Sequence, residues 1–552
     1  MLSPSRFALL GTGLLAALAL LRGGPPSPIR FELKPIAFRL ESGESAARHV
    51  PAAMLGGVAV FDYNKDGRPD IFFTNGANLQ TLQKDSAKYS NRLFRNDGNG
   101  VFTDVTEKSG LAGAGYDCGV AVADFDNDGY PDIFLAGVHR NSLYRNNHDG
   151  TFTDVTVKAG IKNTPDPEYG PMWAVAGAWV DVNNDGLLDL MVLNYLQWDF
   201  ATEPLCEYKG VADYCAPRSY KGLPSELYLN KGDGTFEDVS EKWGIHPKVG
   251  KGMGVAVADY DLDGLPDLFV TNDGSYNFLF HNTGNSFEEV AFPAAVALVE
   301  DGAFISGMGA DFRDLDNDGF PDIAFAALER QTFPIFRNMA GRQFREVTTP
   351  SGMRTASISK AGFGVGIYDL DNDGWKDIFV SRGDVLSRAM PGTTTNQFNS
   401  AFHNPGATGK WIALTEEAGL DAAPAARHRG LAFGDLDGDG RVDVVTAAIG
   451  APAEIWMNRS PQSGHWLDIA LEGVKSNRDG IGARIKVTAK SGVQYNHMTT
   501  SVGYASSSDG PVHFGLGAND TAQSIEIHWP SGTVQTLKNV RADRVLAVKE
   551  AQ

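Results

Sequence analysis

The stretch Asp124-Phe125-Asp126-Asn127-Asp128-Gly129-Tyr130-Pro131-Asp132 places aspartates at positions 1, 3, 5 and 9 of a nine-residue loop, with glycine at position 6. The flanking segments 120–123 and 133–136 are apolar and rich in Val, Ile and Phe, which is typical of buried β-strands. The same pattern, an apolar strand, D-x-[DN]-x-D-G-x-x-D and a second apolar strand, occurs seven times. Such a repeat predicts a chain built from one supersecondary unit.

The side-chain oxygens of each loop come from positions 1, 3, 5 and 9. In chain order these residues are Asp62, Asn64, Asp66 and Asp70; Asp124, Asp126, Asp128 and Asp132; Asp181, Asn183, Asp185 and Asp189; Asp259, Asp261, Asp263 and Asp267; Asp314, Asp316, Asp318 and Asp322; Asp369, Asp371, Asp373 and Asp377; and Asp435, Asp437, Asp439 and Asp443. A calcium ion takes six to eight oxygen ligands, and alternate residues of a tight loop supply them. We therefore predict up to seven structural Ca²⁺ ions.

Position 7 of such a loop contributes only its backbone carbonyl, so its side chain is free to vary. The residues there are Arg68, Tyr130, Leu187, Leu265, Phe320, Trp375 and Arg441. An EF-hand would instead require Glu at position 12 and flanking helices. Position 12 is Phe73 in the first loop and Leu135 in the second, and the flanks have the composition of strands, so an EF-hand is excluded. The first loop, with Asn64, Lys65 and Arg68, is predicted to bind calcium most weakly.

A second motif follows the loops, clearest as Asn91-Arg92-Leu93-Phe94-Arg95-Asn96, and leads to a glycine turn and a further strand. Each unit then holds four antiparallel strands, the content of one propeller blade. The seventh unit lacks its last strand, while the apolar segment 36–40 precedes the first unit. We predict an all-β, seven-bladed β-propeller whose ring is closed by this N-terminal strand, which removes exposed sheet edges.

The repeats resemble the FG-GAP, or VCBS, repeats of the integrin α-subunit propeller. The C-terminal stretches 476–483, 513–517 and 529–532 resemble the ASPIC/UnbV domain. Together they are similar to the cartilage acidic protein family, from about Ile36 to the end of the chain. The resemblance implies an exported, calcium-binding protein. In the C-terminal region, alternation at Leu467, Ile469 and Leu471 independently predicts a small β-sandwich or barrel.

The expected organisation is a signal peptide or N-terminal anchor at 1–28, the propeller at 29–460 and the ASPIC/UnbV-like domain at 461–552. Residues 7–21 are apolar but short for a membrane span, and prolines follow them, as in an export signal. The alternative is an uncleaved anchor, and only through such an anchor do we expect the protein to attach to a membrane. We expect a secreted, periplasmic or cell-surface protein.

Export permits a disulfide, and Cys206 and Cys215 lie close together in a loop-like segment, so we pair them. Cys118 precedes an apolar strand and is expected to be a buried small hydrophobe. The net charge of −20 argues against nucleic acid as a partner, because phosphate binding requires clusters of Lys and Arg. Much of this charge belongs to the predicted metal loops.

The insertion after the third loop is rich in aromatic residues and contains both paired cysteines. Its notable residues are Tyr195, Trp198, Phe200, Cys206, Tyr208, Tyr214, Cys215, Arg218 and Tyr220. Such a segment either presents a ligand platform or caps an apolar blade end. Asn477, Arg478 and Asp479 either form a polar site or order a turn, and the turn is favoured.

The sequence contains no G-x-S-x-G elbow, no H-E-x-x-H and no Cys/His cluster with zinc spacing, so no catalytic residue is assigned. Two function classes remain. The first is an extracellular binding or adhesion module for a protein or glycan. The second is a propeller enzyme, a hydrolase or lyase that acts on an extracellular polymer. Convergent carboxylates with an arginine in the central pocket would favour the enzyme.

Overall fold

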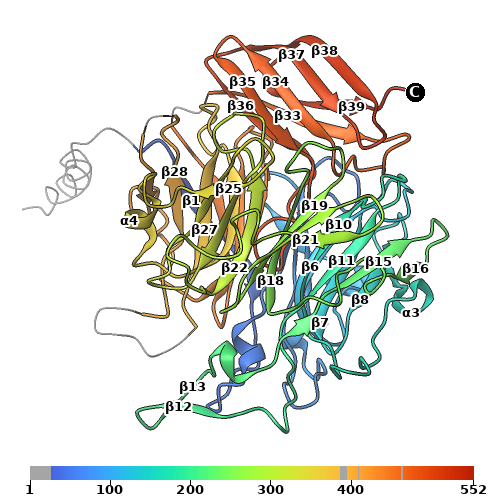
Figure 1. Ribbon diagram of the computed structural model, residues 1–552, viewed down its shortest axis with the longest axis vertical. Coiled ribbons are helices and arrows are strands. Elements are labelled where there is room, and N and C mark those ends of the chain that lie inside the picture. The colour runs from blue at the N-terminus through green and yellow to red at the C-terminus, as the bar shows by residue number, and fades with distance from the viewer. Residues whose placement is uncertain (1–26, 386–393, 408, 462–463) are drawn as a thin grey trace, which may run out of the picture.

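The computed structural model describes residues 27–385, 394–407, 409–461 and 464–552 (Figure 1). The predicted export segment, 1–28, lies almost wholly outside these ranges. The described chain is all-β apart from short helical turns, as predicted. These are η1 (Val50–Ala53), η2 (Ala87–Tyr89), η3 (Pro217–Ser219), α2 (Thr106–Ser109), α3 (Thr156–Ala159) and α4 (Met353–Ser357). Among the described residues, no helix has the length and apolar character of a membrane span.

Within the described ranges, the repeats form seven four-stranded antiparallel sheets, and each acidic loop joins the first and second strands of one sheet. The strands are β2 (Val58–Phe61), β3 (Asp70–Phe73), β4 (Arg92–Asn96) and β5 (Phe102–Asp104); β6 (Tyr116–Ala123), β7 (Asp132–Val138), β8 (Ser142–Asn146) and β9 (Phe152–Asp154); β10 (Ala174–Val180), β11 (Asp189–Asn194), β15 (Glu226–Asn230) and β16 (Phe236–Asp238); β18 (Gly252–Ala258), β19 (Asp267–Asn272), β20 (Phe278–Asn282) and β21 (Phe287–Glu289); β22 (Gly307–Arg313), β23 (Asp322–Ala327), β24 (Ile335–Asn338) and β25 (Phe344–Glu346); β26 (Gly362–Tyr368), β27 (Asp377–Arg382), β28 (Ser400–His403) and β29 (Ile412–Leu414); and β30 (His428–Gly434), β31 (Asp443–Ala448), β32 (Pro452–Asn458) and β1 (Phe31–Arg39).

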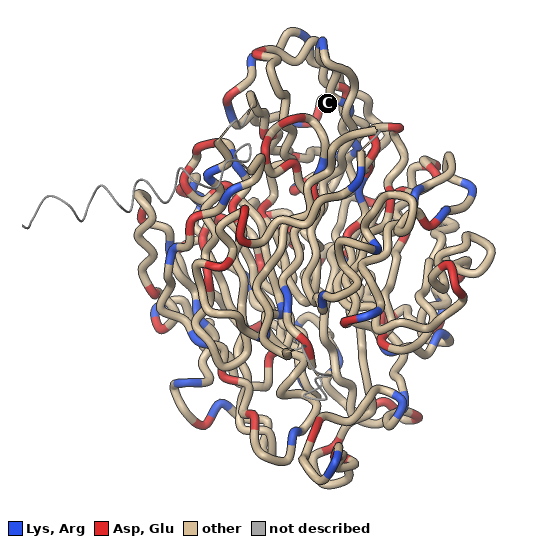
Figure 2. The backbone as a smooth tube through the Cα atoms, turned by 90° about the vertical axis from the view of Figure 1, so that its left-hand side faces the viewer, with Lys and Arg blue, Asp and Glu red and all other residues tan. Residues whose placement is uncertain are grey.

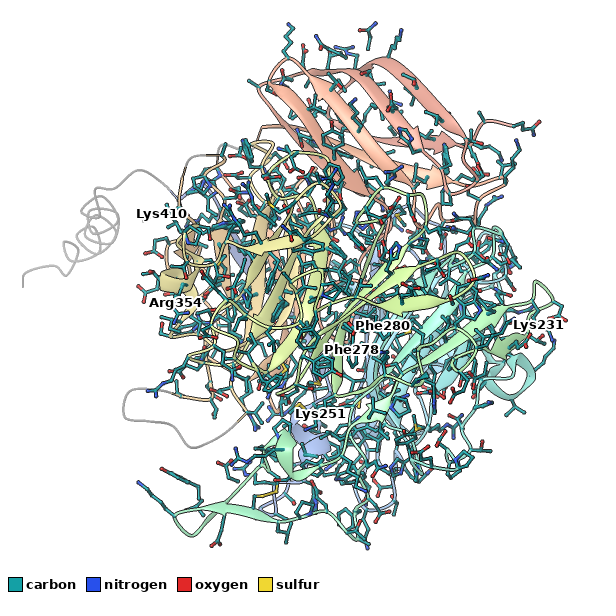
Figure 3. The ribbon with its side chains drawn as sticks, in the orientation of Figure 1. Lys231, Lys251, Phe278, Phe280, Arg354 and Lys410 are labelled. Atoms are coloured by element: carbon teal, nitrogen blue, oxygen red, sulfur yellow. A yellow bond between two sulfur atoms is a disulfide. The ribbon has the colours of Figure 1, made fainter. Side chains whose placement is uncertain are left out.

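The first strands of successive sheets contact one another, and β2 also contacts β30, so the sheets form a closed ring. The strands converge toward the centre, which leaves space only for small residues. A Cβ atom on Gly119 would lie 2.1 Å from the Val175 carbonyl oxygen, and one on Gly254 would lie 2.6 Å from that of Met308. Larger apolar side chains pack farther out between sheets, as Phe278 and Phe280 do, whereas Lys231, Arg354 and Lys410 lie at the periphery (Figure 3).

The seventh sheet is completed by the N-terminal strand, as predicted. β1 pairs antiparallel with β32, with Phe31 opposite Asn458 and Arg39 opposite Pro452. The strand begins five residues earlier than the predicted segment 36–40, because the pairing extends back to Phe31 along the whole edge of β32. The first and last parts of the repeat region therefore share one sheet, which closes the ring.

The C-terminal region is a β-sandwich, one of the two predicted alternatives. One sheet contains β33 (His465–Glu472), β36 (Val512–Gly517) and β39 (Arg544–Lys549). The other contains β34 (Arg484–Ala489), β35 (Gly492–His497), β37 (Thr521–His528) and β38 (Val534–Arg541). Their apolar faces form one buried cluster with residues of the second and third sheets of the ring, so the sandwich packs on one end of the propeller (Figure 1).

The centre of the ring is filled by the segment 499–509, which connects β35 to β36 and is here called the central segment. The N–H of Val60 donates to the Ser507 carbonyl at 3.0 Å, and that of Val120 donates to the Ala505 carbonyl at 3.0 Å. On the opposite side, the Gly503 N–H donates to the Ala310 carbonyl at 3.1 Å. A segment of the sandwich therefore satisfies backbone groups of innermost strands around the axis.

The other end of the ring is capped by the insertion after the third loop. It carries the hairpin β12 (Cys206–Tyr208) and β13 (Val211–Asp213), and β14 (Leu223–Pro224) pairs with β17 (Val249–Gly250). Tyr195, Trp198 and Tyr214 are buried in the same apolar cluster as the innermost strands. The hairpin projects from the end opposite the sandwich (Figure 1). The capping interpretation is therefore correct for these aromatics.

The predicted disulfide between Cys206 and Cys215 is present, with a Cα–Cα distance of 5.2 Å (Figure 3). Cys118 is a free, buried thiol, as predicted. Burial raises its pKa to about 12, so it behaves as a small hydrophobe.

Candidate metal centres

All seven acidic loops share one backbone arrangement. In the second loop, the N–H of Gly129 donates to Asp124 Oδ2 at 2.6 Å, and the N–H of Tyr130 donates to Asp128 Oδ1 at 3.0 Å. The equivalent two bonds occur in the other six loops. The residue at position 7 therefore donates its N–H to the aspartate at position 5 in every loop. That its carbonyl oxygen also binds the metal ion stays a prediction.

The position-9 aspartate lies under each loop and is almost completely buried. Asp70 accepts the N–H of Tyr63 at 3.2 Å and that of Asn96 at 2.7 Å. Burial is the main cause that raises the pKa of Asp70 to about 8 and that of Asp132 well above its ordinary value. Two backbone donors thus fall short of offsetting the desolvation of this carboxylate, so the site favours an added positive charge.

Several loop carboxylates converge closely enough to share one ion. Donor atoms of Asp124, Asp126 and Asp132 lie within 4.8 Å of one another, as do those of Asp314, Asp316 and Asp322. One buried carboxylate oxygen on each of Asp259, Asp316 and Asp371 has no hydrogen-bond partner. An unpartnered buried oxygen is costly unless something binds it, so these residues fit a divalent cation held by oxygen ligands.

The loops differ in the cations that already lie beside their acids. In the first loop, Arg68 Nη2 is 2.6 Å from Asp66 Oδ2. In the seventh loop, Arg441 pairs with Asp439, and Arg459 lies 2.7 Å from Asp437 Oδ2 and 3.0 Å from Asp439 Oδ2. Guanidinium groups therefore neutralise part of these two loops.

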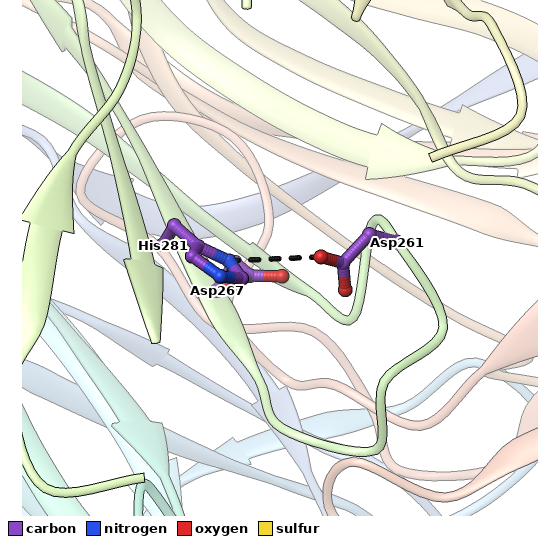
Figure 4. Close-up of side chains that lie close together, drawn as sticks. All are labelled: Asp261, Asp267 and His281. Atoms are coloured by element: carbon purple, nitrogen blue, oxygen red, sulfur yellow. Dashed lines mark hydrogen bonds and ion pairs between the residues drawn. The ribbon is translucent and has the colours of Figure 1, made fainter. Parts of the chain in front are cut away.

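The residue before the Asn at the end of each third strand is Arg95, Arg145, Leu229, His281, Arg337, His403 or Met457. Four of these residues, Arg145, His281, Arg337 and His403, contact an aspartate of the loop in their own sheet. His281 Nδ1 lies 3.1 Å from Asp267 Oδ1 and 3.7 Å from Asp261 Oδ2 (Figure 4). A hydrogen bond to Asp267 is the main cause that raises the pKa of His281 to about 9. The motif at 91–96 contained this signal, but sequence analysis did not connect it with the loops.

The terminal Asn of each third strand ties its sheet to the preceding one. Asn146 Nδ2 donates to the Tyr63 carbonyl at 2.9 Å, and Asn96 Nδ2 donates to the Leu436 carbonyl at 2.8 Å, which links the first sheet to the seventh. The other five sheets show the same bond. These amides hold the loops in register around the ring, and they were also missed from the sequence.

Position 4 provides a second link between loops. Asn127 Nδ2 donates to the carbonyl of Gly186, the position-6 residue of the next loop, at 2.9 Å. Asn184, Asn317 and Asn372 make the same bond to Gly264, Gly374 and Gly440. Position 4 is Lys65, Leu262 and Gly438 in the remaining loops, whose side chains offer no amide.

The C-terminal sandwich covers the face of the ring that carries the acidic loops. The N–H of Asp124 donates to Asp479 Oδ2 at 2.8 Å, and the N–H of Arg478 donates to Asn127 Oδ1 at 2.8 Å. Asn477 bonds the backbone of Ile481 through both amide atoms. The favoured turn interpretation of 477–479 is therefore correct, and this turn docks on the second loop.

Two cavities lie between the sandwich and the loops. One, of about 290 Å³, is lined by Leu262, Arg484 and Trp529. The other, of about 390 Å³, is lined by Lys65, Gly438 and Asp509. Acidic residues are spread over the whole backbone, with Lys and Arg among them (Figure 2).

Comparison with known families agrees with the repeat and the sandwich. The family described as FG-GAP-like repeat matches residues 62–135, 124–192, 213–270, 259–325 and 314–380. The family described as ASPIC and UnbV matches residues 473–552.

The chain is 26% identical over 531 residues to cartilage acidic protein 1 of Mus musculus, covering 91% of this chain and 74% of that protein. It is 25% identical to the Homo sapiens protein of the same name, over 91% of this chain and 72% of that protein. A shorter match to integrin alpha-4 of Xenopus laevis is 32% identical and covers 26% of this chain and 16% of that protein.

Two solved structures resemble the chain at low TM-scores. One is a lectin of Agrocybe aegerita that recognises non-reducing terminal N-acetylglucosamine, with a TM-score of 0.41, 16% identity, and coverage of 72% of this chain and 86% of that chain. The other is a rhamnogalacturonan lyase, with a TM-score of 0.39, 12% identity, and coverage of 79% and 76%.

Proposed function

Because the chain belongs to the FG-GAP-like repeat family, with the C-terminal ASPIC and UnbV domain of the cartilage acidic proteins, we propose that it is an exported calcium-loaded scaffold that binds an extracellular protein or glycan. The disulfide between Cys206 and Cys215 supports an oxidising compartment. The propeller supplies a rigid frame, and the metal ions hold its loops.

The placement of the acidic loops supports a structural role for calcium. The loops lie under the sandwich, where the second loop contacts Asp479 and Arg478. An ion bound there neutralises buried carboxylates and strengthens the docking of the sandwich. In every loop the side chains at positions 1, 3, 5 and 9 offer oxygen atoms, which is the ligand chemistry that Ca²⁺ prefers.

The surface proposed to contact the partner is the projecting hairpin β12–β13. Leu205, Tyr208 and Val211 are 70%, 45% and 65% exposed, while the disulfide fixes the backbone beneath them. Exposed apolar and aromatic side chains on a rigid loop are typical of protein and sugar contacts. We therefore propose that the binding face lies at the end of the ring opposite the metal loops.

A screen of glycan and extracellular-protein arrays in the presence of Ca²⁺ tests this proposal. The Leu205→Ser, Tyr208→Ser, Val211→Ser triple variant should lose the signals that the unmodified protein gives. Val157→Ser is the matched control, because Val157 is 92% exposed on α3, far from the hairpin. Equal binding by the triple variant would reject the hairpin as the contact.

Convergent carboxylates with an arginine in the central pocket would favour the alternative, a polymer-cleaving enzyme. In the described chain, the central segment and the buried aromatics of the insertion fill that region. A catalytic centre would have to use another part of the molecule. The binding module is the function that the geometry supports better.

A further inference from the structure

The fourth and sixth loops each have a third-strand imidazole beside two of their aspartates, whereas the imidazole at the second loop, His148, contacts Asp128 alone and is 44% exposed. His403 Nδ1 lies 3.2 Å from Asp377 Oδ1 and 3.7 Å from Asp371 Oδ2. His281 in the fourth loop has nearly the same distances, 3.1 Å and 3.7 Å, to Asp267 and Asp261 (Figure 4). In each loop the three donor atoms lie within 4.8 Å of one another. The same geometry therefore arises twice in different sequence surroundings.

An independent observation points to a ligand at both loops. Asp371 Oδ1 and Asp259 Oδ1 are buried carboxylate oxygens without a hydrogen-bond partner. The side chain of Asp371 is only 9% exposed and that of Asp259 only 8%. Leaving such oxygens unsatisfied is costly, and neither imidazole bonds them.

We propose that the sixth and fourth loops each hold a divalent ion of the zinc class through two aspartates and one histidine, while the all-oxygen loops hold calcium. This inference rests on the proposed metal-loaded scaffold and divides its sites into two classes. Imidazole is a ligand that Zn²⁺ prefers and that hard, oxygen-seeking Ca²⁺ does not. Tetrahedral ligands on bonds of about 2.0–2.2 Å lie roughly 3.4 Å apart, close to the spacing of these donors.

The second and fifth loops have arginine at the same third-strand position. Arg337 pairs with Asp316, and Arg145 lies 3.9 Å from Asp126 Oδ2. A guanidinium stays protonated and has no lone pair for a metal, so it cannot become a ligand. The exchange of Arg for His therefore changes the class of metal that the site can take.

The sixth loop should bind zinc more tightly than the fourth. Arg484 of the sandwich lies 3.6 Å from Asp259 Oδ2 and adds positive charge to the fourth loop. His403 is also less exposed than His281, with side-chain exposures of 16% and 25%. Both differences weaken cation binding at the fourth loop relative to the sixth.

The test loads metal-stripped full-length protein with Zn²⁺ alone and then dialyses it against excess Ca²⁺. We expect about two zinc ions per chain to remain, and imidazole scattering to appear in the zinc K-edge X-ray absorption spectrum of the unmodified protein. His403→Gln should remove one ion, and His281→Gln with His403→Gln should remove both. Thermal unfolding in Ca²⁺ checks that the variants fold. The spectrum of the unmodified protein tests the inference even if a variant fails to fold.

Arg145→Gln with Arg337→Gln is the matched control and should leave zinc retention unchanged. His148→Gln serves as the second control, because His148 Nε2 lies 2.6 Å from Asp128 Oδ2 but its side chain is 44% exposed. Retained zinc without imidazole scattering, or zinc lost to Ca²⁺, would overturn the inference and leave the calcium scaffold intact. Failure to bind either metal would overturn the scaffold as well.

Discussion

The sixth and seventh loops are neighbours that carry aspartates at the same four positions but differ in what surrounds them. In the sixth loop, Asp371 has an unpartnered buried oxygen, and His403 stands beside it. In the seventh loop, Arg441 and Arg459 pair with Asp437 and Asp439. Identical motifs thus give one loop that requires a cation and one that is already partly neutralised.

This contrast shows that the nine-residue motif determines the backbone of the loop and the positions of its oxygens. The net charge of the site is set by residues outside it, at the end of the third strand or just beyond. Affinity in such loops follows the charge of the surrounding groups. The seven loops should therefore not be seven equal sites.

Chelation should produce the largest effect. Binding to the folded state alone stabilises it by about 1.4 kcal/mol per site at tenfold saturation. If the first, fifth and seventh loops, in which a guanidinium pairs with an aspartate, contribute little, the other four give roughly 6 kcal/mol, a large share of the 5–15 kcal/mol typical of a domain. Thermal unfolding in chelator should show a large fall in Tm, restored by Ca²⁺ and poorly by Mg²⁺. An unchanged Tm would mean that the loops are ordinary turns.

Removing the residues through Arg39 should have the next largest effect, confined at first to the seventh sheet. The truncation removes β1 and exposes the partners of Phe31, Ile36 and Phe38, each of which contributes about 1.5–3 kcal/mol by burial. We expect a loss of roughly 5 kcal/mol and hydrogen exchange that rises in β32 before β28. Equal Tm values for trimmed and full-length protein would reject the role of β1 in closure.

In chelator, stability should fall as the pH rises from about 4 to about 8. Burial raises the pKa of Asp435 to about 6, that of Asp181 to about 7 and that of Asp369 well above its ordinary value of 3.8. The folded state therefore holds protons that the unfolded state has released, and this stabilisation is lost as the pH rises through the folded pKa values. Denaturant titrations of metal-free protein at pH 5 and pH 8 measure the effect. Greater stability at pH 8 would contradict this assignment.

Replacing Arg441 and Arg459 together with glutamine should have the smallest effect, a gain in calcium affinity at the seventh loop alone. Partly exposed ion pairs contribute about 0.2–1 kcal/mol each, so a several-fold rise is expected. Calorimetric titration should detect an additional ion in the calcium-binding range. Arg145→Gln is the comparison, since its guanidinium is 3.9 Å from Asp126 Oδ2 and should have less influence. No change in stoichiometry or affinity would show that the guanidinium groups do not compete.

Much of the fold could be predicted from the sequence because its determinants are local. The acidic loops, the apolar strands, the missing strand of the seventh unit and the pair Cys206–Cys215 each lie within short stretches of chain. The central segment could not be predicted, because its small and polar residues, such as Ser506 and Ser507, have no periodicity. Their burial depends on backbone bonds to strands far away in the sequence, such as β2 and β6.

The candidate sites were predicted only in part, for a similar reason. The loop ligands follow from spacing, but the partners that tune them, such as His403 and Arg459, stand outside the loops. The aromatic insertion also shows the limit of composition, because buried Tyr214 and half-exposed Tyr208 are close in sequence. Only tertiary packing separates them.

The central segment has a consequence for biosynthesis. A ribosome makes residues 499–509 after the repeats that form all seven sheets. Val58 and Val60 of β2, the innermost strand of the first sheet, nevertheless bond to Ser507. A nascent chain that stops after the seventh sheet has a ring with a hollow axis and unpaired amides around it. The central segment must then enter as a loop, because both of its ends continue into the sandwich, at β35 and β36. We therefore expect that a chain truncated after the seventh sheet is cleaved by proteases more readily than the full chain.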